Sequence, residues 1–428
     1  MSTPGTVDAG LDPAAAARKE QLLKDLARAK EAGWNEQMPF KYETVVGGTP
    51  APDETRDSAT WLSDAAIYQW DDEFGDVGEP NPALERQLFH DENHQRAGGA
   101  INAFSFEVNT EGPTKVQPVR NFEDAGLHPV MLQNVKLCQY QAPTPIQSYC
   151  IPAVLTGNDV VAIAQTGSGK TAAFLIPILS RLMGKARQLA AARPNPARYN
   201  PSVDRVRAEP LVLIVCPTRE LACQIFDEAR RLCYRTMLRP CVIYGGAPTK
   251  NQREQLEMGC DILVATPGRL MDFMQNNKLL SLKRLKFTVI DEADELLSSG
   301  WEEAMEKIFQ GGDVNNDADH THLMFSATFP KSARRLAKEY MEEDYFSIKV
   351  GRVGSTHKNI KQNVIYVNES EKNQALFDLI FSEEPQRILV FTNSKVKCDM
   401  VDDFLYNKGL PVTSIHSDRT QREREDAL

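Results

Sequence analysis

The chain has 428 residues, of which 42% are hydrophobic and 25% are charged, and its formal net charge is −10. That length allows two or three domains, and that composition is ordinary for a soluble protein with substantial cores. The sequence holds no run of about 18 uncharged apolar residues, which argues against a membrane span.

Cysteine usage and charge indicate the compartment and the class of partner. Eight cysteines are spread along the chain without a C-x-x-C pair, which favours reduced thiols in a cytoplasmic or nuclear protein. The first residues, Met-Ser-Thr-Pro-Gly, lack the basic start and apolar core of a secretory signal. The negative charge argues against coating of nucleic acid by bulk charge, but it leaves a local basic groove open. We expect a cytoplasmic monomer, with a nuclear location as an alternative.

Residues 1–118 differ from the remainder of the chain and predict a largely disordered N-terminal arm. A helix rich in Ala, Lys and Leu is predicted from Asp12-Pro13 to about Glu31, before scattered glycines and prolines. An acidic-aromatic segment follows between Trp61 and Phe74. This segment is compatible with a docking motif for a protein partner and equally with a solvated tail.

Residues 119–350 alternate short apolar segments with amphipathic helices, which predicts an α/β domain built on a parallel sheet. The strands are expected at Asp159–Ala164, Leu211–Cys216, Pro240–Tyr244, Ile262–Ala265, Phe287–Ile290 and His322–Phe325. Functional groups in such sheets lie at the C-terminal ends of the strands. A proline- and arginine-rich insertion from Met183 to Pro210 predicts a surface loop, either beside a nucleic-acid groove or simply solvated.

Residues 351–361 predict a linker, and residues 362–428 begin a second α/β rhythm. Strands are expected at Asn363–Val367, Arg387–Phe391 and Val412–His416, with helices near 371–381, 394–408 and from Thr420 onward. Three strands do not complete a sheet of the first domain's size, and the sequence ends inside the last helix. The sequence therefore predicts an incomplete second domain.

A glycine-rich loop directly follows the first expected strand and resembles a phosphate-binding loop. Its residues are Ala164, Gln165, Thr166, Gly167, Ser168, Gly169, Lys170 and Thr171. The glycines let backbone N–H groups close around phosphates, and Lys170 is expected to reach the β- and γ-phosphates. Thr171 is a candidate Mg²⁺ ligand at the start of a helix whose dipole favours anions.

The segment Asp291-Glu292-Ala-Asp294 follows another expected strand and carries the carboxylates that phosphoryl transfer needs. Asp291 suits a Mg²⁺ partner, and Glu292 is placed to polarise an attacking water. By itself this segment is compatible with simple charge capping of a helix N-terminus. Together with the phosphate loop it predicts a site for ATP and Mg²⁺.

These motifs resemble those of the DEAD-box RNA helicases, and most closely their Vasa-like branch, from about Asn121 to the end of the chain. The resemblance implies a doubly wound, RecA-like first domain and a second domain of the same kind. It implies that Gln147 reads the adenine edge, that Tyr140 stacks on the base and that Phe122 is the isolated upstream aromatic. Ala164, unusual as the start of a generic phosphate loop, is typical of this family. Catalytic roles are implied for Lys170, Asp291, Glu292, Asp294, Ser326 and Thr328.

The resemblance also implies a set of RNA-contacting residues in both domains. They are Pro217, Thr218, Arg219, Gly245, Gly246, Thr266, Pro267, Gly268, Arg269, Thr392, Asn393, Gln421 and Arg424. Hydroxyls and guanidiniums at turns and helix starts suit contacts to backbone phosphates that do not read bases. Trp301 is expected to anchor a helix to the core, and we assign His416 no role.

The chain departs from the family pattern because it contains no H-R-x-G-R-x-G-R run and no A-R-G-x-D. We therefore expect it to bind ATP and RNA but to hydrolyse ATP slowly. The leading hypothesis is an ATP-dependent RNA helicase that separates RNA strands locally. The alternatives are a non-catalytic module that binds ATP, RNA or a partner, and a DNA-directed translocase with a similar core.

Overall fold

The computed structural model describes residues 24, 27, 31, 78, 80–89, 107–189, 191, 194, 200, 203–276, 278–310, 320–351, 360–420, 423, 424 and 427. The described residues fall into two compact units that divide after residue 357, and each unit is described by itself. Most of the predicted arm, including its acidic-aromatic segment, lies outside the described residues. In the part of the chain that is described, no helix is long and apolar enough to cross a membrane.

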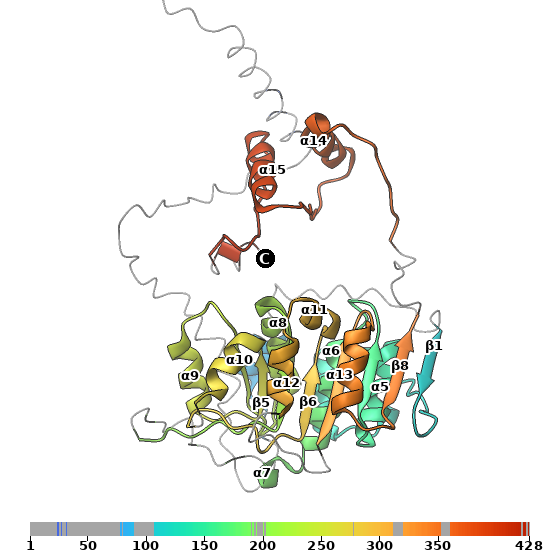
Figure 1. Ribbon diagram of the computed structural model, residues 1–428, viewed down its shortest axis with the longest axis vertical. Coiled ribbons are helices and arrows are strands. Elements are labelled where there is room, and N and C mark those ends of the chain that lie inside the picture. Colours follow the sequence, from blue (N-terminus) through green and yellow to red (C-terminus); the bar gives the residue numbers. More distant parts are fainter. Residues whose placement is uncertain are drawn as a thin grey trace, which may run out of the picture. The chain divides into compact units, whose positions relative to one another are not determined.

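An eight-stranded sheet forms the centre of the first unit (Figure 1), in the order β1-β8-β2-β7-β6-β3-β5-β4. All neighbouring strands pair in parallel except β1 and β8, which are antiparallel. The strands are β1 Val108–Glu111, β2 Val160–Ile163, β3 Val212–Val215, β4 Pro240–Ile243, β5 Ile262–Ala265, β6 Phe287–Ile290, β7 Thr321–Ser326 and β8 Phe346–Val350. The six predicted strands are confirmed, each within one residue at either end.

Helices cover both faces of the sheet, so the buried strands β2, β3 and β5 are apolar at every position. Along β2, Val160 and Ala162 belong to one core, and Val161 and Ile163 belong to the other. The first core is closed by α4 Pro129–Leu137, α5 Pro145–Leu155, α6 Lys170–Leu182 and α8 Arg219–Leu232. The second is closed by α9 Thr249–Glu257, α10 Pro267–Met274, α11 Ala293–Ser298, α12 Glu302–Gln310 and α13 Lys331–Tyr340. Short helices η3 Glu123–Ala125 and α7 Ala186–Leu189 lie in the connections.

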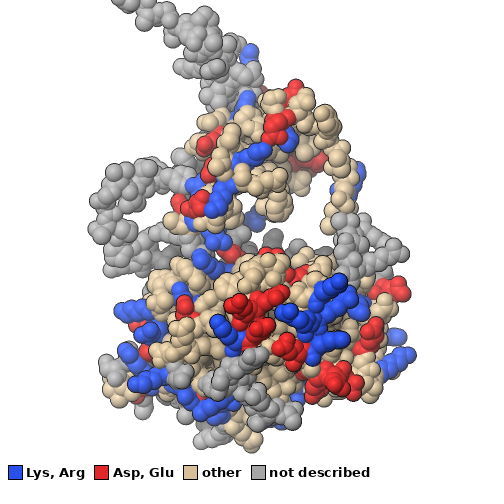
Figure 2. Space-filling model, in the orientation of Figure 1, with Lys and Arg blue, Asp and Glu red and all other residues tan. Residues whose placement is uncertain are grey.

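Opposite charges meet on the outer surface of α12 and α13. In Figure 2 the acidic side chains of α12 lie beside the basic side chains of α13. Arg335 bridges them, with its Nη2 3.3 Å from Glu302 and 3.9 Å from Glu306. Acidic and basic side chains therefore lie side by side on this face, and the face does not carry negative charge alone.

The prediction of a largely disordered arm up to residue 118 is wrong for two segments. Residues Val108–Glu111 form β1 and cover the edge of the sheet at β8. Residues Pro82–Phe89 form helix α3, whose Leu84 and Leu88 are buried against Tyr234. Neither element was predicted from the sequence, because each is short and stabilised by a partner distant in the chain.

Tyr234 holds the segment before and within α3 in place. Its hydroxyl accepts a hydrogen bond from Asn81 N at 3.0 Å and lies 2.9 Å from Glu85 Oε2. Its ring meets Phe89 edge to face, with the centroids 5.6 Å apart. Arg235 adds a two-way bridge, because Gly78 N donates to Arg235 O and Arg235 Nε donates to Gly78 O, each at 3.0 Å.

The second unit contains η5 Glu369–Glu371, α14 Lys372–Ser382 and α15 Lys395–Asn407, which confirms two predicted helices. Residues 423, 424 and 427 are helical, as expected after Thr420.

The prediction of three strands in this unit is wrong, since residues 360–420 contain no strand. Without a neighbouring strand to complete hydrogen bonds and cover side chains, Val364, Tyr366 and Phe391 stay 98%, 92% and 87% exposed. A small core of Phe377, Ile380, Leu405 and Leu410 joins the helices.

Replacing Tyr234 by Phe is expected to lower the free energy of unfolding of the first unit by about 1–2 kcal/mol, because the half-buried partners Asn81 and Glu85 lose their hydrogen bonds. Urea titration followed by circular dichroism measures the change. Tyr366→Phe is the matched control, since Tyr366 is 92% exposed, and it should leave the titration unchanged. Equal behaviour of the two variants would contradict the role given to the Tyr234 hydroxyl.

Candidate active site at the strand ends

The candidate site lies at the C-terminal ends of β2, β7 and β6, which are adjacent in the sheet. The phosphate loop follows β2, Ser326 ends β7, and Asp291 follows β6. Ala164 N donates to Ser326 O at 3.0 Å, and Asp291 N donates to Val215 O at 2.9 Å. The parallel pairing therefore brings the phosphate loop and the acidic segment to one edge, as predicted.

Two glycines give the phosphate loop its shape. Gly167 has φ +75° and Gly169 has φ +88°, which is the left-handed region that favours glycine. Gly169 also lacks space for a side chain, because a Cβ there would lie 2.5 Å from Gln147 Nε2. Helix α6 begins at the next residue, Lys170, so its N-terminal N–H groups face the loop.

Gln147 connects the start of α5 to the phosphate loop. It forms a capping box with Thr144, in which Thr144 N donates to Gln147 Oε1 at 3.0 Å. Its Nε2 donates to Gly169 O at 3.1 Å, and the side chain is almost completely buried. The residue predicted to read the base is therefore tied to the residue that ends the loop.

Lys170 and Glu292 meet directly. Lys170 is 6% exposed, and its Nζ lies 3.2 Å from Glu292 Oε1 and donates to Ala164 O at 3.1 Å. Since a buried ammonium group requires a partner, this ion pair accounts for its charge. The phosphate loop and the acidic segment thus share one small volume.

Asp291 is buried beside this pair, and its Oδ1 accepts a hydrogen bond from Glu292 N at 3.0 Å. Burial raises the pKa of Asp291 to about 7, and the negative charge of Glu292 adds to the rise while Lys170 opposes it. Glu292 itself has φ +50°, a left-handed conformation that is costly for a residue with a side chain. Thr171, the other predicted metal ligand, is half-buried in the first turn of α6.

Asp294 joins the acidic segment to the Ser326–Thr328 segment. Its N donates to Ser326 Oγ at 3.2 Å, and its Oδ2 accepts from Thr328 Oγ1 at 2.6 Å and Thr328 N at 2.9 Å. Burial works to raise the pKa of Asp294, but the hydrogen bonds from Thr328 and Ser326 hold it below its usual value. These three residues therefore form one connected unit.

A second group of predicted residues gathers around Gly245-Gly246, after β4. Thr218 caps α8 by accepting from Leu221 N at 3.2 Å, and Arg219 lies against Gly246, where a Cβ would be 2.1 Å from Arg219 Nη1. Gly246 has φ +85°, so glycine is required there on both grounds. The predicted residues of α8 and of this turn are thus brought together.

Arg269 joins the same group but is buried, with 7% exposure. Its Nη1 donates to Gln252 Oε1 at 3.1 Å, and its Nη2 donates to Ala247 O at 3.2 Å. Burial lowers the pKa of Arg269, Asp272 opposes this, and the positive charge of Arg219 adds to the lowering. Two guanidinium groups therefore lie close together at this turn.

Gln252 is a residue that the sequence analysis missed. Its Oε1 accepts from Tyr244 N and its Nε2 donates to Tyr244 O, each at 3.1 Å, while Oε1 also receives Arg269. It thereby joins α9 to the end of β4 and fixes Arg269. The sequence feature that could have identified Gln252 is its spacing from Leu256, which places both residues on the buried face of α9.

Thr266, Pro267 and Gly268 begin α10, where Thr266 and Pro267 are buried. Trp301 packs against this turn, since a Cβ on Gly268 would lie 3.4 Å from Trp301 Cη2. The expected role of Trp301 as a helix anchor agrees with its contact with the second core. Pro217 is half-buried just before Thr218.

Tyr140 and Phe122 lie together on the side of the first core. Their ring centroids are 6.2 Å apart, and Phe122 is only 2% exposed while Tyr140 is half-buried. Phe122 therefore supports Tyr140 from within the core in this structure. The Tyr140 hydroxyl donates to Glu228 Oε1 on α8 at 2.5 Å.

The last part of the inserted segment, residues 203–210, lies away from the candidate site. Ala208 bridges to Leu280 and Leu211 precedes β3, so this end of the insertion sits at the N-terminal edge of the sheet. Arg207 and Arg284 pair with Glu209 there. Residues 203–210 therefore lie at the opposite edge of the sheet from the phosphate loop, and a position of the insertion beside a nucleic-acid groove stays a prediction.

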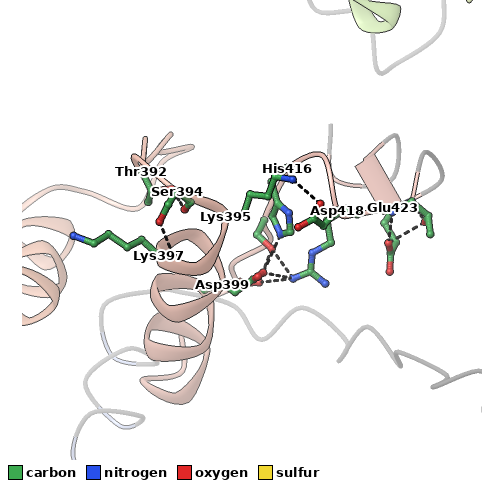
Figure 3. Close-up of polar contacts among 12 residues, drawn as sticks. Thr392, Ser394, Lys395, Lys397, Asp399, His416, Asp418 and Glu423 are labelled. Carbon is green, nitrogen blue, oxygen red and sulfur yellow. Dashed lines mark hydrogen bonds and ion pairs between the residues drawn. The ribbon is translucent and has the colours of Figure 1, made fainter. Parts of the chain in front are cut away.

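In the second unit, Thr392 Oγ1 donates to Ser394 O at 3.3 Å and Asn393 is exposed. Arg424 is half-buried, and Gln421 lies outside the described residues. Asp399 lies 2.9 Å from His416 Nε2 (Figure 3), and it accepts a hydrogen bond from the Arg419 guanidinium at 3.1 Å. His416 thus has a structural contact, in agreement with the absence of an assigned role.

Known proteins match the chain over most of its length. Residues 144–336 match the DEAD/DEAH box helicase family, and residues 371–428 match the helicase conserved C-terminal domain. The yeast DEAD-box splicing factor Prp28 is 30% identical, covering 82% of this chain and 74% of its own, with a TM-score of 0.51. The chain belongs to the DEAD-box RNA helicase family.

Two further relatives agree in sequence. The RNA helicase Prp28 from Chaetomium thermophilum, solved with ADP, is 32% identical over 75% of this chain and 72% of its own, with a TM-score of 0.47. A DEAD box protein from Methanococcus jannaschii is 33% identical over 72% and 76%, with a TM-score of 0.46. As a DEAD-box protein, this chain is an ATP-dependent RNA helicase with RecA-like α/β architecture.

Replacing Asp291 by Asn in this DEAD-box protein is expected to stabilise the nucleotide-free first unit at pH 8. A carboxyl whose pKa rises from 3.8 to about 7 on folding costs stability in its charged form. The gain should be full above pH 7, on the order of a few kcal/mol, and should vanish as the pH falls towards 4. Thermal unfolding in EDTA from pH 4 to 8 measures it.

Asp344→Asn is the control for the Asp291 experiment, because Asp344 is exposed and its substitution should have no comparable effect. A lower melting temperature for Asp291→Asn at pH 8 would contradict the cost assigned to the buried charge.

Proposed function

We propose that this helicase binds ATP with Mg²⁺ between the phosphate loop and the Asp291–Asp294 segment, and that it is a member of the Vasa-like branch. The observation that carries the site is the 3.2 Å approach of Lys170 Nζ to Glu292 Oε1. It supports a shared volume in which Lys170 meets the β- and γ-phosphates and Glu292 orients the attacking water. Its motifs support the branch, because they follow the Vasa-like pattern from Phe122 to Arg424.

The residues present fit a magnesium ion. Asp291 supplies a carboxylate at a strand end, and Thr171 supplies a hydroxyl in the first turn of α6. Hard oxygen donors in small number suit Mg²⁺, which keeps several of its waters. When bound, the ion neutralises negative charge that develops on the phosphate oxygens. The raised pKa of Asp291 belongs to a buried carboxylate whose negative charge Lys170 compensates only in part.

Nucleotide binding in this scheme exchanges one partner of Lys170 for another. In the nucleotide-free geometry Lys170 pairs with Glu292 and Ala164 O. Phosphate oxygens that reach Lys170 replace Glu292, and the released carboxylate turns to accept a proton from water. The base is thus restrained until the triphosphate occupies the loop.

Hydrolysis reaches the rest of the domain through Asp294. Its hydrogen bonds to Ser326 and Thr328 connect the segment that holds Glu292 with the end of β7. A shift of Glu292 is therefore transmitted to Thr328 along the backbone from Glu292 to Asp294 and through the hydrogen bond between Asp294 and Thr328. We assign this connection the coupling of hydrolysis to RNA strand separation.

RNA is bound through its backbone. Arg219, Gly246 and the buried Arg269 provide positive charge and close main-chain approach, and no aromatic platform lies among these three residues. Thr392, Asn393 and Arg424 of the second unit are also assigned RNA contacts. Such contacts hold RNA without reading its sequence.

We assign the acidic-aromatic segment of the arm to a protein partner. We also assign the protein to the cytoplasm or the nucleus.

Turnover by the 428-residue chain is proposed to be slow, since its sequence lacks the H-R-x-G-R-x-G-R run. Arginines that reach the γ-phosphate are worth about 10³–10⁵ in rate. Phosphate release measured with single-stranded RNA should therefore stay near the RNA-free rate. Rapid turnover stimulated by RNA would contradict the proposal, and stimulation by DNA alone would favour a DNA translocase.

Lys170→Ala is expected to weaken ATP binding about 10- to 100-fold, because the phosphates lose a charged donor. Glu292→Gln should leave binding equal or tighter, since Lys170 loses its competing ion pair, and should lower residual hydrolysis about 10²- to 10⁴-fold. Titration with a fluorescent ATP analogue and single-turnover phosphate release separate the two effects. Normal binding by Lys170→Ala, or unchanged hydrolysis by Glu292→Gln, would remove that residue from its role.

Gln252→Leu is expected to weaken RNA binding and to reduce the slope of log Kd against log salt by about 1, because Arg269 loses its fixed position. Fluorescence anisotropy with single-stranded RNA at several salt concentrations measures both quantities. Asn251→Leu on the same helix is the control and should leave the slope unchanged. A weaker affinity with an unaltered slope would show that Gln252 does not act through Arg269.

A further inference from the structure

We propose that Glu228, in the middle of α8, is a positioning residue for the adenine ring, because it holds the hydroxyl of Tyr140. This inference rests on the proposed nucleotide site, in which Tyr140 stacks on the base. Glu228 belongs to none of the motifs that carry the sequence resemblance. It acts through Tyr140 and does not touch the nucleotide.

The first observation is the contact itself. The Tyr140 hydroxyl donates to Glu228 Oε1 at 2.5 Å, a short distance typical of an O–H···O⁻ hydrogen bond. Glu228 is 8% exposed, so its carboxylate is shielded from water. A buried carboxylate that accepts a hydroxyl proton holds that hydroxyl more firmly than water would.

The second observation is that Glu228 is itself held. Its Oε2 lies 3.2 Å from Arg231 Nη1, one helical turn along α8. Arg231 Nε in turn donates to Leu88 O of α3 at 3.1 Å. The carboxylate therefore has a fixed orientation and cannot follow Tyr140 if the ring turns away.

The third observation is that the Tyr140 ring is restrained at two places. Phe122, which is 2% exposed, packs against the ring, and Glu228 holds its para-hydroxyl. A ring with fixed torsion angles stacks on a base without a further loss of side-chain entropy. Pre-organisation of this kind raises affinity for the base while leaving phosphate contacts unchanged.

The position of Glu228 also explains why this helix provides the acceptor. Helix α8 begins at Thr218 and Arg219, which are assigned to RNA, and carries Glu228 two and a half turns later. One rigid helix therefore contacts both the proposed base-stacking tyrosine and the proposed RNA phosphates. Because Tyr140 is held by α8, the proposed base-stacking residue and the proposed RNA-binding residues of α8 keep a fixed spacing.

The test uses the full 428-residue chain and two ligands, ADP and inorganic tripolyphosphate, which lacks a base. Glu228→Leu and Tyr140→Phe should each raise the Kd for ADP about five- to tenfold, which is the size of the effect of one hydrogen bond of ordinary strength. Neither should change the Kd for tripolyphosphate. The double variant should bind ADP no more weakly than either single variant.

Two controls separate positioning from a general structural role. Glu228→Gln keeps an acceptor for the hydroxyl and should restore ADP binding to within about twofold. Asp227→Asn, at the adjacent residue, should leave ADP binding unchanged, since the Asp227 carboxylate pairs with Arg230 at 3.7 Å. Isothermal titration calorimetry gives the affinities, and circular dichroism shows whether each variant is folded.

Equal losses for ADP and tripolyphosphate in Glu228→Leu would overturn the inference, as would fully additive effects of the two substitutions or an unchanged Kd for ADP. If the unsubstituted chain binds neither ligand, the proposed nucleotide site itself fails and the positioning role fails with it.

Discussion

A buried ammonium group sets the constraint on which this architecture depends. Lys170 is almost inaccessible to water, so its charge must be met by oxygen atoms that the fold brings to it. In a parallel sheet those atoms come from neighbouring strand ends, and the order β2-β7-β6 delivers Ala164 O and Glu292 to the same place. Gly167, Gly169 and Glu292 adopt left-handed backbone conformations, and these conformations allow the phosphate loop and the acidic segment to converge on Lys170.

The sequence predicts the central part of the first unit well, because its signals there are local. Six apolar segments bounded by turns identify the parallel strands, and loop glycines followed by Lys170 and Thr171 identify the phosphate end of the site. The geometry that joins Lys170 to Glu292 was also predictable, since parallel strands share one functional edge. The binding roles of individual residues stay predictions, because the contacts in the structure join these residues to other protein residues and not to a ligand.

Features that depend on distant partners were not predictable in the same way. Strand β1 is only four residues long, and it exists because β8 pairs with it from the far end of the unit. Arg269 was expected to contact RNA, but its burial and its hydrogen bonds to Gln252 and Ala247 O were not predicted. In the second unit, alternating apolar segments suggested strands, but β propensity requires a neighbouring strand to become a sheet.

The antiparallel pairing of β1 with β8 carries a consequence for how the protein is made. Every other strand of the sheet can pair with parallel neighbours from within residues 160–326, whereas β1 leaves the ribosome early and its partner emerges near the end of the unit. Closing such a long loop is slow and follows formation of the central strands. Until then this edge of the sheet is open, first at β2 and then at β8, so the nascent protein passes through a stage in which a chaperone can recognise an unprotected sheet edge.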